Sequence, residues 1–199
     1  SKRVELNLGS DASCKARHSG PVYHDAVLIE QGKLQNVYVH IAKGLEGVRL
    51  PAPPTADVVL DGCDNFATRF LVNDACHIAG KTLVSAAVLR FDGQLATFKS
   101  HLGGANPCYR CIYPEPPPPG LIPTCSEGGV LGALAGTMGT LQATEVLKEI
   151  LGVGDSLAGW LMIYDGLGTT FRKVKVRPDP ACKLCGPQPS ITDLSSHAA

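Results

Sequence analysis

Two cysteine pairs of the form C-x-x-C constrain this chain more than any other feature of its sequence. Cys108 pairs with Cys111 and Cys182 with Cys185, and residues 112–181 separate these four paired cysteines into two groups. The C-x-x-C spacing lets both sulfurs of a pair reach one ion, and four thiolates suit tetrahedral zinc. We therefore predict a structural zinc site that brings two segments distant in the sequence together.

A dithiol redox motif and two unrelated cysteine pairs are the alternative interpretations. A thioredoxin-like C-x-x-C opens a helix after a strand, whereas Cys108 follows turn residues and is soon followed by a run of prolines. The remaining cysteines Cys14, Cys63 and Cys76 are expected to be inert, because a buried thiol behaves as a small hydrophobic group.

The composition is that of a folded protein with little affinity for polyanions. Of the 199 residues, 44% are hydrophobic, and 18 basic residues balance 18 acidic ones. Nucleic-acid binding depends on clustered Lys and Arg, and a bilayer span needs about 18 consecutive apolar residues. The sequence has neither feature and shows no secretory signal. We therefore expect a cytoplasmic protein that binds neither nucleic acid nor membranes.

Changes in sequence pattern divide the chain into four segments. The first is expected to be a β-rich appendage with a hairpin, the second a proline-rich linker, the third the main α/β domain and the fourth a polar, fraying tail. These segments are residues 1–50, 51–56, 57–189 and 190–199.

Alternating strand and helix patterns predict an α/β fold with a partial, Rossmann-like mixed sheet and zinc-binding loops. Val58–Leu60 is typical of a buried strand, residues 65–79 of a helix, and residues 82–88 of the next strand. A helix between two strands makes them parallel. A long helix is predicted over residues 130–151, and the later strands, after the zinc-binding loop of residues 100–126, are expected to be antiparallel.

Two carboxylates, Asp61 and Asp64, follow the first buried strand. Ligands bind at the carboxyl ends of strands in open α/β sheets, and a carboxylate there can hold magnesium while nucleotide phosphates complete its shell. Alternatively, Asp64 or Asn65 caps the next helix. Both interpretations can hold together if one residue caps the helix and its neighbour reaches the metal.

Cys125 is a candidate nucleophile. If the long helix begins close to Cys125, the amides at the helix N-terminus would stabilise its thiolate and suit nucleophilic catalysis. The alternative is an incidental cysteine, and the local sequence does not separate the two.

Taken together and in order, these motifs resemble the MoeB/ThiF/HesA family, whose members are related to ubiquitin-activating enzymes. Within it, the resemblance is strongest to the molybdopterin-synthase adenylyltransferases, and it covers residues from about 57 to 193. The matching stretches are residues 59–69, 93–94, 107–111, 124–130, 139–145, 164–165 and 182–185.

The resemblance implies an adenylyltransferase that uses ATP and magnesium to activate the C-terminal glycine of a ubiquitin-like sulfur-carrier protein. Such sulfur transfer serves molybdopterin or thiamine biosynthesis, and the enzymes usually form homodimers. The resemblance implies that Asp64 serves magnesium and the ATP phosphates, with Asn65 and Arg69 near the bound cofactors. It makes the four paired cysteines zinc ligands and Cys125 the residue that some members use for a covalent thioester or persulfide.

Residues 1–56 depart from the family pattern. They lack the glycine-rich nucleotide loop, the acidic ribose-binding residue, the arginine finger and the phosphate-binding lysine, and short stretches resemble a cupredoxin-like β domain. ATP binding and adenylation are therefore expected to be weak or absent in this chain. Two other functions stay open: a non-catalytic, zinc-stapled module that binds a carrier protein or dimerises, and a thiol redox protein.

Overall fold

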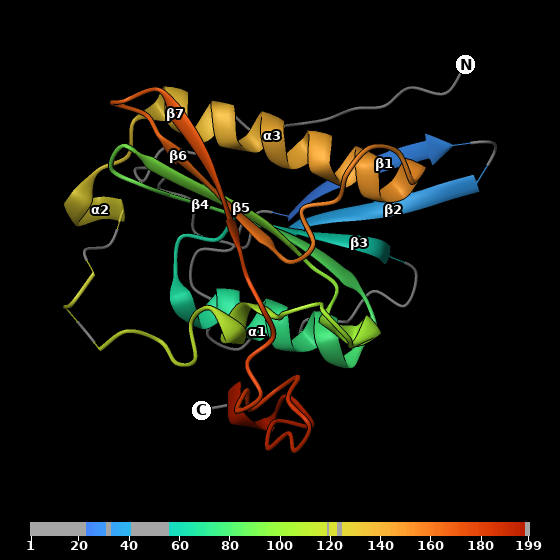
Figure 1. Cartoon of the computed structure of the whole chain (residues 1–199). Helices are drawn as coiled ribbons and strands as arrows, with labels where there is room; N and C mark the ends of the chain where they lie inside the picture. The colour runs from blue at the N-terminus through green and yellow to red at the C-terminus, as the bar shows by residue number, and fades with distance from the viewer. Residues whose placement is uncertain (1–22, 31–32, 41–55, 119, 123–124, 198–199) are drawn as a thin grey trace.

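The computed structural model describes residues 23–30, 33–40, 56–118, 120–122 and 125–197 (Figure 1). The described strands form one sheet whose spatial order follows the chain. These strands are β1 (Tyr23–Glu30), β2 (Lys33–His40), β3 (Ala56–Asp61), β4 (Thr82–Leu89), β5 (Asp92–Phe98), β6 (Trp160–Asp165) and β7 (Thr170–Lys175).

The helices of the described chain are α1 (Phe66–Ile78), the single turn α2 (Cys125–Gly128) and α3 (Gly132–Leu151). Three short 3-10 turns accompany them: η1 (Ser100–Leu102), η2 (Tyr109–Cys111) and η3 (Ser195–His197). None of the described helices is both long enough and apolar enough to cross a lipid bilayer.

The sheet is mixed, as predicted. β3 pairs in parallel with β4, since α1 returns the chain to the same end of the sheet. β5, β6 and β7 follow in antiparallel order. The expected hairpin near the N-terminus is present as β1 and β2, and β2 pairs in parallel with β3. The hairpin therefore continues the main sheet.

One long helix lies on each face of the sheet, with α3 above and α1 below in Figure 1. Neighbouring residues of β4 point to opposite faces, because side chains alternate along a strand. Val84 and Ala86 pack in the core beneath α3, whereas Leu83 packs in the core beside α1.

The packing of α3 against β5 leaves no room for a side chain at Gly93. A Cβ atom there would lie 2.4 Å from Sδ of Met138, a fully buried residue of α3. At its C-terminal end, α3 stops at Gly152, which adopts the left-handed conformation that suits glycine in a helix cap. Sheet and helix are thus held at a close, fixed separation.

Candidate functional site

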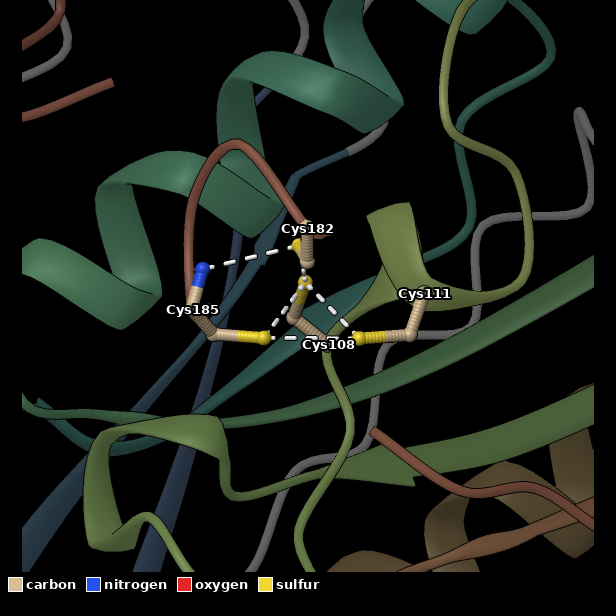
Figure 2. Close-up of side chains that lie close together, drawn as sticks. All are labelled: Cys108, Cys111, Cys182 and Cys185. Atoms are coloured by element: carbon tan, nitrogen blue, oxygen red, sulfur yellow. Dashed lines mark hydrogen bonds between the residues drawn. The ribbon is translucent and has the colours of Figure 1, made fainter. Parts of the chain in front are cut away.

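The four paired cysteines meet in space, although they lie far apart in sequence (Figure 2). The Sγ atom of Cys108 lies 3.8 Å from that of Cys111, 3.5 Å from that of Cys182 and 3.4 Å from that of Cys185. Four sulfurs arranged tetrahedrally at the Zn–S distance of about 2.3 Å would be roughly 3.8 Å apart. The spacing and chemistry of this cluster fit a metal ion.

Each cysteine pair sits on a tight turn. The amide of Cys111 donates to the carbonyl of Cys108 (3.1 Å), and that of Gly186 donates to the carbonyl of Cys182 (3.1 Å). A Cβ at position 186 would lie 2.5 Å from the carbonyl oxygen of Cys182, so this turn requires glycine. Leu184 is buried against the cluster and shields it from water.

The thiols of the cluster shift one another's pKa in opposite directions. Hydrogen bonds to Cys111 and Cys185, together with burial, raise the pKa of Cys108. The hydrogen bond from Cys108 in turn lowers the pKa of Cys111 to about 2. Without a metal, neighbouring thiols in such a cluster are linked by S–H···S hydrogen bonds. A divalent cation would displace these protons, because metal coordination deprotonates a thiol outright.

A buried carboxylate on α1 ties the first cysteine turn to the rest of the fold. Arg110 Nε and Nη2 donate to Asp74 Oδ1 and Oδ2 at 2.8 and 2.7 Å, and the Asp74 side chain is wholly buried. His197 Nε2 lies 2.8 Å from Asp74 Oδ2. The C-terminal segment, expected to fray, is therefore tied to α1 through His197.

A cleft of about 800 Å³ lies at the carboxyl ends of β3 and β4. This is the edge where open α/β sheets bind ligands. The proline-rich segment forms the outer wall through residues such as Pro117, Leu121 and Ile122. Asp64, Asn65 and Arg69, all predicted from the sequence, line this cleft together.

Of the two residues after β3 that could cap α1, Asn65 is the cap. The side chain of Asn65 caps α1, accepting a hydrogen bond from the amide of Thr68 at 2.8 Å. Asp64 is exposed in the cleft, and no residue within the described part of the chain bonds its carboxylate. Its oxygens are thus accessible to a cation.

Arg69 is held inside the protein although it lines the cleft. Its Nη1 donates to Ser85 Oγ and to the carbonyl of Ala86, both at 2.9 Å, and lies 3.2 Å from Asp61 Oδ2. Burial alone would lower the pKa of Arg69, but the negative charge of Asp61 raises it above its ordinary value. Several donors of Arg69 are therefore engaged in fixing the loop after β3.

Comparison with known proteins identifies the family. A model described as the ThiF family matches residues 41–184 of this chain. The chain belongs to the ThiF family. Mouse "Adenylyltransferase and sulfurtransferase MOCS3" is 51% identical over 144 residues, which are 72% of this chain and 31% of that protein. The "Sulfur carrier protein adenylyltransferase" of Thermus thermophilus is 49% identical over 145 residues, 72% of this chain and 54% of that protein.

This ThiF-family chain thus spans between 31% and 54% of the length of these two relatives. The MOCS3 protein of Drosophila yakuba is 51% identical over 195 residues, 98% of this chain and 37% of that protein. That alignment, with a family match that starts at residue 41, gives no support to a cupredoxin-like segment in residues 1–56.

Solved structures agree with the ThiF-family fold. Escherichia coli MccB superposes with a TM-score of 0.54 at 16% identity, covering 67% of this chain and 41% of MccB. A heterocyclase in complex with substrate and cofactor gives a TM-score of 0.55 at 14% identity, covering 76% of this chain and 25% of that protein. At such low identity these matches show the fold alone.

The position of Cys125 in the ThiF-family chain differs from the sequence expectation. The long helix begins at Gly132, and Cys125 opens the separate single turn α2. A single turn has a much smaller dipole than a long helix, because fewer peptide dipoles are aligned, so it stabilises a thiolate at its N-terminus less. The side chain of Cys125 lies outside the described atoms, so its role as a nucleophile stays a prediction.

Sequence reasoning missed several residues of the site. Ser85 accepts from Arg69 and donates to Asp61 Oδ2 at 2.7 Å. Gln142 of α3 donates to the carbonyls of Asp61 and Val84, both at 2.9 Å. A single serine in a strand or glutamine in a helix has no motif of its own, and only the register of β3 and β4 reveals its partners.

Proposed function

We propose that this chain carries the magnesium-facing and zinc-binding part of an adenylyltransferase that activates a ubiquitin-like sulfur-carrier protein. The observation that carries the proposal is the exposed Asp64 carboxylate at the carboxyl end of β3, in a cleft of about 800 Å³. The names of the MOCS3 and sulfur carrier protein adenylyltransferase relatives support the same reaction.

In this reaction, a carboxylate oxygen at the C-terminus of the carrier attacks the α-phosphorus of ATP. The bond from that phosphorus to the pyrophosphate group breaks, and an acyl-adenylate and pyrophosphate result. Magnesium, when bound, neutralises phosphate charge in such a transfer. In this proposal Asp64 would hold the ion, while Asp61, Ser85 and Arg69 keep the loop that carries Asp64 in one conformation.

We further propose that the four paired cysteines hold a structural zinc ion. Four sulfur donors at 3.4 to 3.8 Å from their neighbours, in a partly buried site where they fill a tetrahedral shell, are typical of structural zinc. The ion would fix the segment around Cys108 and the segment around Cys182 to each other.

Carrier-dependent exchange between ATP and radiolabelled pyrophosphate tests the proposed reaction. The full chain, with magnesium and a ubiquitin-like protein ending in Gly-Gly, should catalyse weak, carrier-dependent exchange, because residues 1–56 lack the glycine-rich nucleotide loop. Asp64→Asn should reduce it by about 100-fold or more, because losing one group that stabilises transition-state charge has this effect. Asp155→Asn, a change of an exposed aspartate in the loop after α3, is the matched control and should leave exchange unchanged.

A non-catalytic module is the second candidate, favoured by the absence of a glycine-rich nucleotide loop from residues 1–56 of the sequence. Binding of the carrier that is independent of ATP and survives Asp64→Asn, with no exchange, would select it over the enzyme. Homodimer formation, implied by the family resemblance, is tested by the molar mass of the full chain in light scattering.

A further inference from the structure

Some charged residues of the cleft form hydrogen bonds or ion pairs within the protein, and others do not. Arg69 is occupied by Asp61, Ser85 and backbone carbonyls, and Glu115 forms an ion pair with Lys183. Arg90 is exposed and lines the cleft, and its guanidinium bonds to nothing in the described ranges of the chain. Arg90 is therefore the cation of the described cleft lining that is available to a ligand.

The backbone of Arg90 is held in a conformation that costs free energy. Its φ angle is +54°, in the left-handed region that favours glycine. Its amide donates to the carbonyl of Gly129 (3.1 Å), and its carbonyl accepts from the amide of Leu131 (3.2 Å), so the segment between α2 and α3 fixes it. Such strain in a residue other than glycine is concentrated at ligand-binding and active sites.

The cleft needs a cation if it is to hold an anion. Asp64 and Asp92 are exposed and line it, and two carboxylates repel an anionic ligand. A cation at Asp64 would offset one of these charges, and Arg90 at the end of β4 supplies a second positive centre. A guanidinium is also suited to the task, because it pairs with carboxylate or phosphate oxygens through two parallel hydrogen bonds.

Resting on the proposed function, we propose that Arg90 binds an anionic group of a substrate in this cleft. The group is an oxyanion: either the C-terminal carboxylate of the acyl substrate or a phosphate of the nucleotide. The strained backbone, fixed from two sides, keeps the Cα atom of Arg90 at the edge of the cleft, within reach of the cleft for its side chain.

Binding of two probes to the full chain tests this role. The first is a fluorescein-labelled peptide ending in Gly-Gly with a free carboxylate, compared with the same peptide as a C-terminal amide. The second is a fluorescent ATP analogue with magnesium. Arg90→Gln should weaken at least one probe by about tenfold, the effect of losing one charge-assisted pair. Arg172→Gln, a change of an exposed arginine on β7, should alter neither.

Arg90→Gly separates ligand binding from folding. Glycine relieves the left-handed strain, so this variant should unfold at the same or a higher temperature and still lose binding as Arg90→Gln does. Arg90 is assigned to the carboxylate if Arg90→Gln weakens binding of the free-acid peptide alone. In that case the amide peptide should bind the wild-type chain as weakly as the free-acid peptide binds the variant. A loss confined to the ATP analogue assigns Arg90 to phosphate.

The proposal is overturned if both probes bind Arg90→Gln as they bind wild type, or if neither probe binds the wild-type chain. This outcome is distinct from failure of the proposed function. Binding that depends on Arg90, without any exchange of pyrophosphate into ATP, would reject the adenylyltransferase while leaving the anion-binding role in place.

Discussion

At the scale of single residues, the buried carboxylate of Asp61 determines the shape of the loop that presents Asp64. It accepts from the amide of Cys63 at 2.9 Å and from Ser85 Oγ at 2.7 Å, and it neutralises Arg69. Removing one partner of such a pair is costly, because the other charge stays buried without compensation.

Asp61→Asn should lower the free energy of unfolding by about 3–5 kcal/mol. The substitution keeps the size of the side chain but leaves the Arg69 charge uncompensated in the interior. Urea denaturation of the variant and of the exposed control Asp155→Asn measures the difference. The double change with Arg69→Met should be less harmful than Asp61→Asn alone. Equal losses for the Asp61 and Asp155 variants would contradict the assignment.

The residues of the site differ in how far the sequence could predict them. Asp64 and Asn65 were predictable because a strand, its edge and a helix cap are local patterns, and both lie in the cleft. The contacts of Gln142 with Asp61 and Val84 were not, because they join residues far apart in sequence. Side chains of this kind become recognisable only when the order of the strands is known.

At the scale of elements, the sheet could be predicted where its patterns are local. The helix between β3 and β4 set their parallel direction. Asp92 and Gly93 have the composition of a turn, but they belong to β5 and pair with Leu89 and Val88, so the turn falls two residues earlier. The long helix, predicted over residues 130–151, is α3 and spans Gly132–Leu151. The separate turn α2 that begins at Cys125 was not predicted, because the glycines before α3 are compatible with either a loop or a helix.

Two glycine-to-alanine changes at the α3 layer should have opposite effects. Gly93→Ala places a Cβ 2.4 Å from Met138 Sδ, so it should destabilise the fold by about 1–3 kcal/mol through overpacking. Gly136→Ala lies on the exposed side of α3 with no atom within 4 Å of the added Cβ. It should stabilise by about 1 kcal/mol through helix propensity. Chemical denaturation measures both, and a shared sign would disprove the packing argument.

At the scale of the whole molecule, the four paired cysteines close the chain into one unit. Asp74 holds Arg110 from the first turn and His197 from the C-terminal segment, and Ile191 packs against the cysteine cluster. Metal binding, the docking of the C-terminal segment and the position of α1 are therefore expected to depend on one another.

Loss of the metal should release the C-terminal segment. Cys111→Ser should abolish binding of about one zinc ion per chain, lower the melting temperature and expose the segment after Gly186 to limited proteolysis. Cys76→Ala is the matched control: Cys76, on α1, is buried in the core and is not one of the four clustered cysteines, so this variant should keep its zinc. Metal analysis and mass spectrometry of the proteolytic fragments measure both variants. Full zinc content in Cys111→Ser, or a protected C-terminal segment in the zinc-free chain, would show that the cluster does not hold the molecule together.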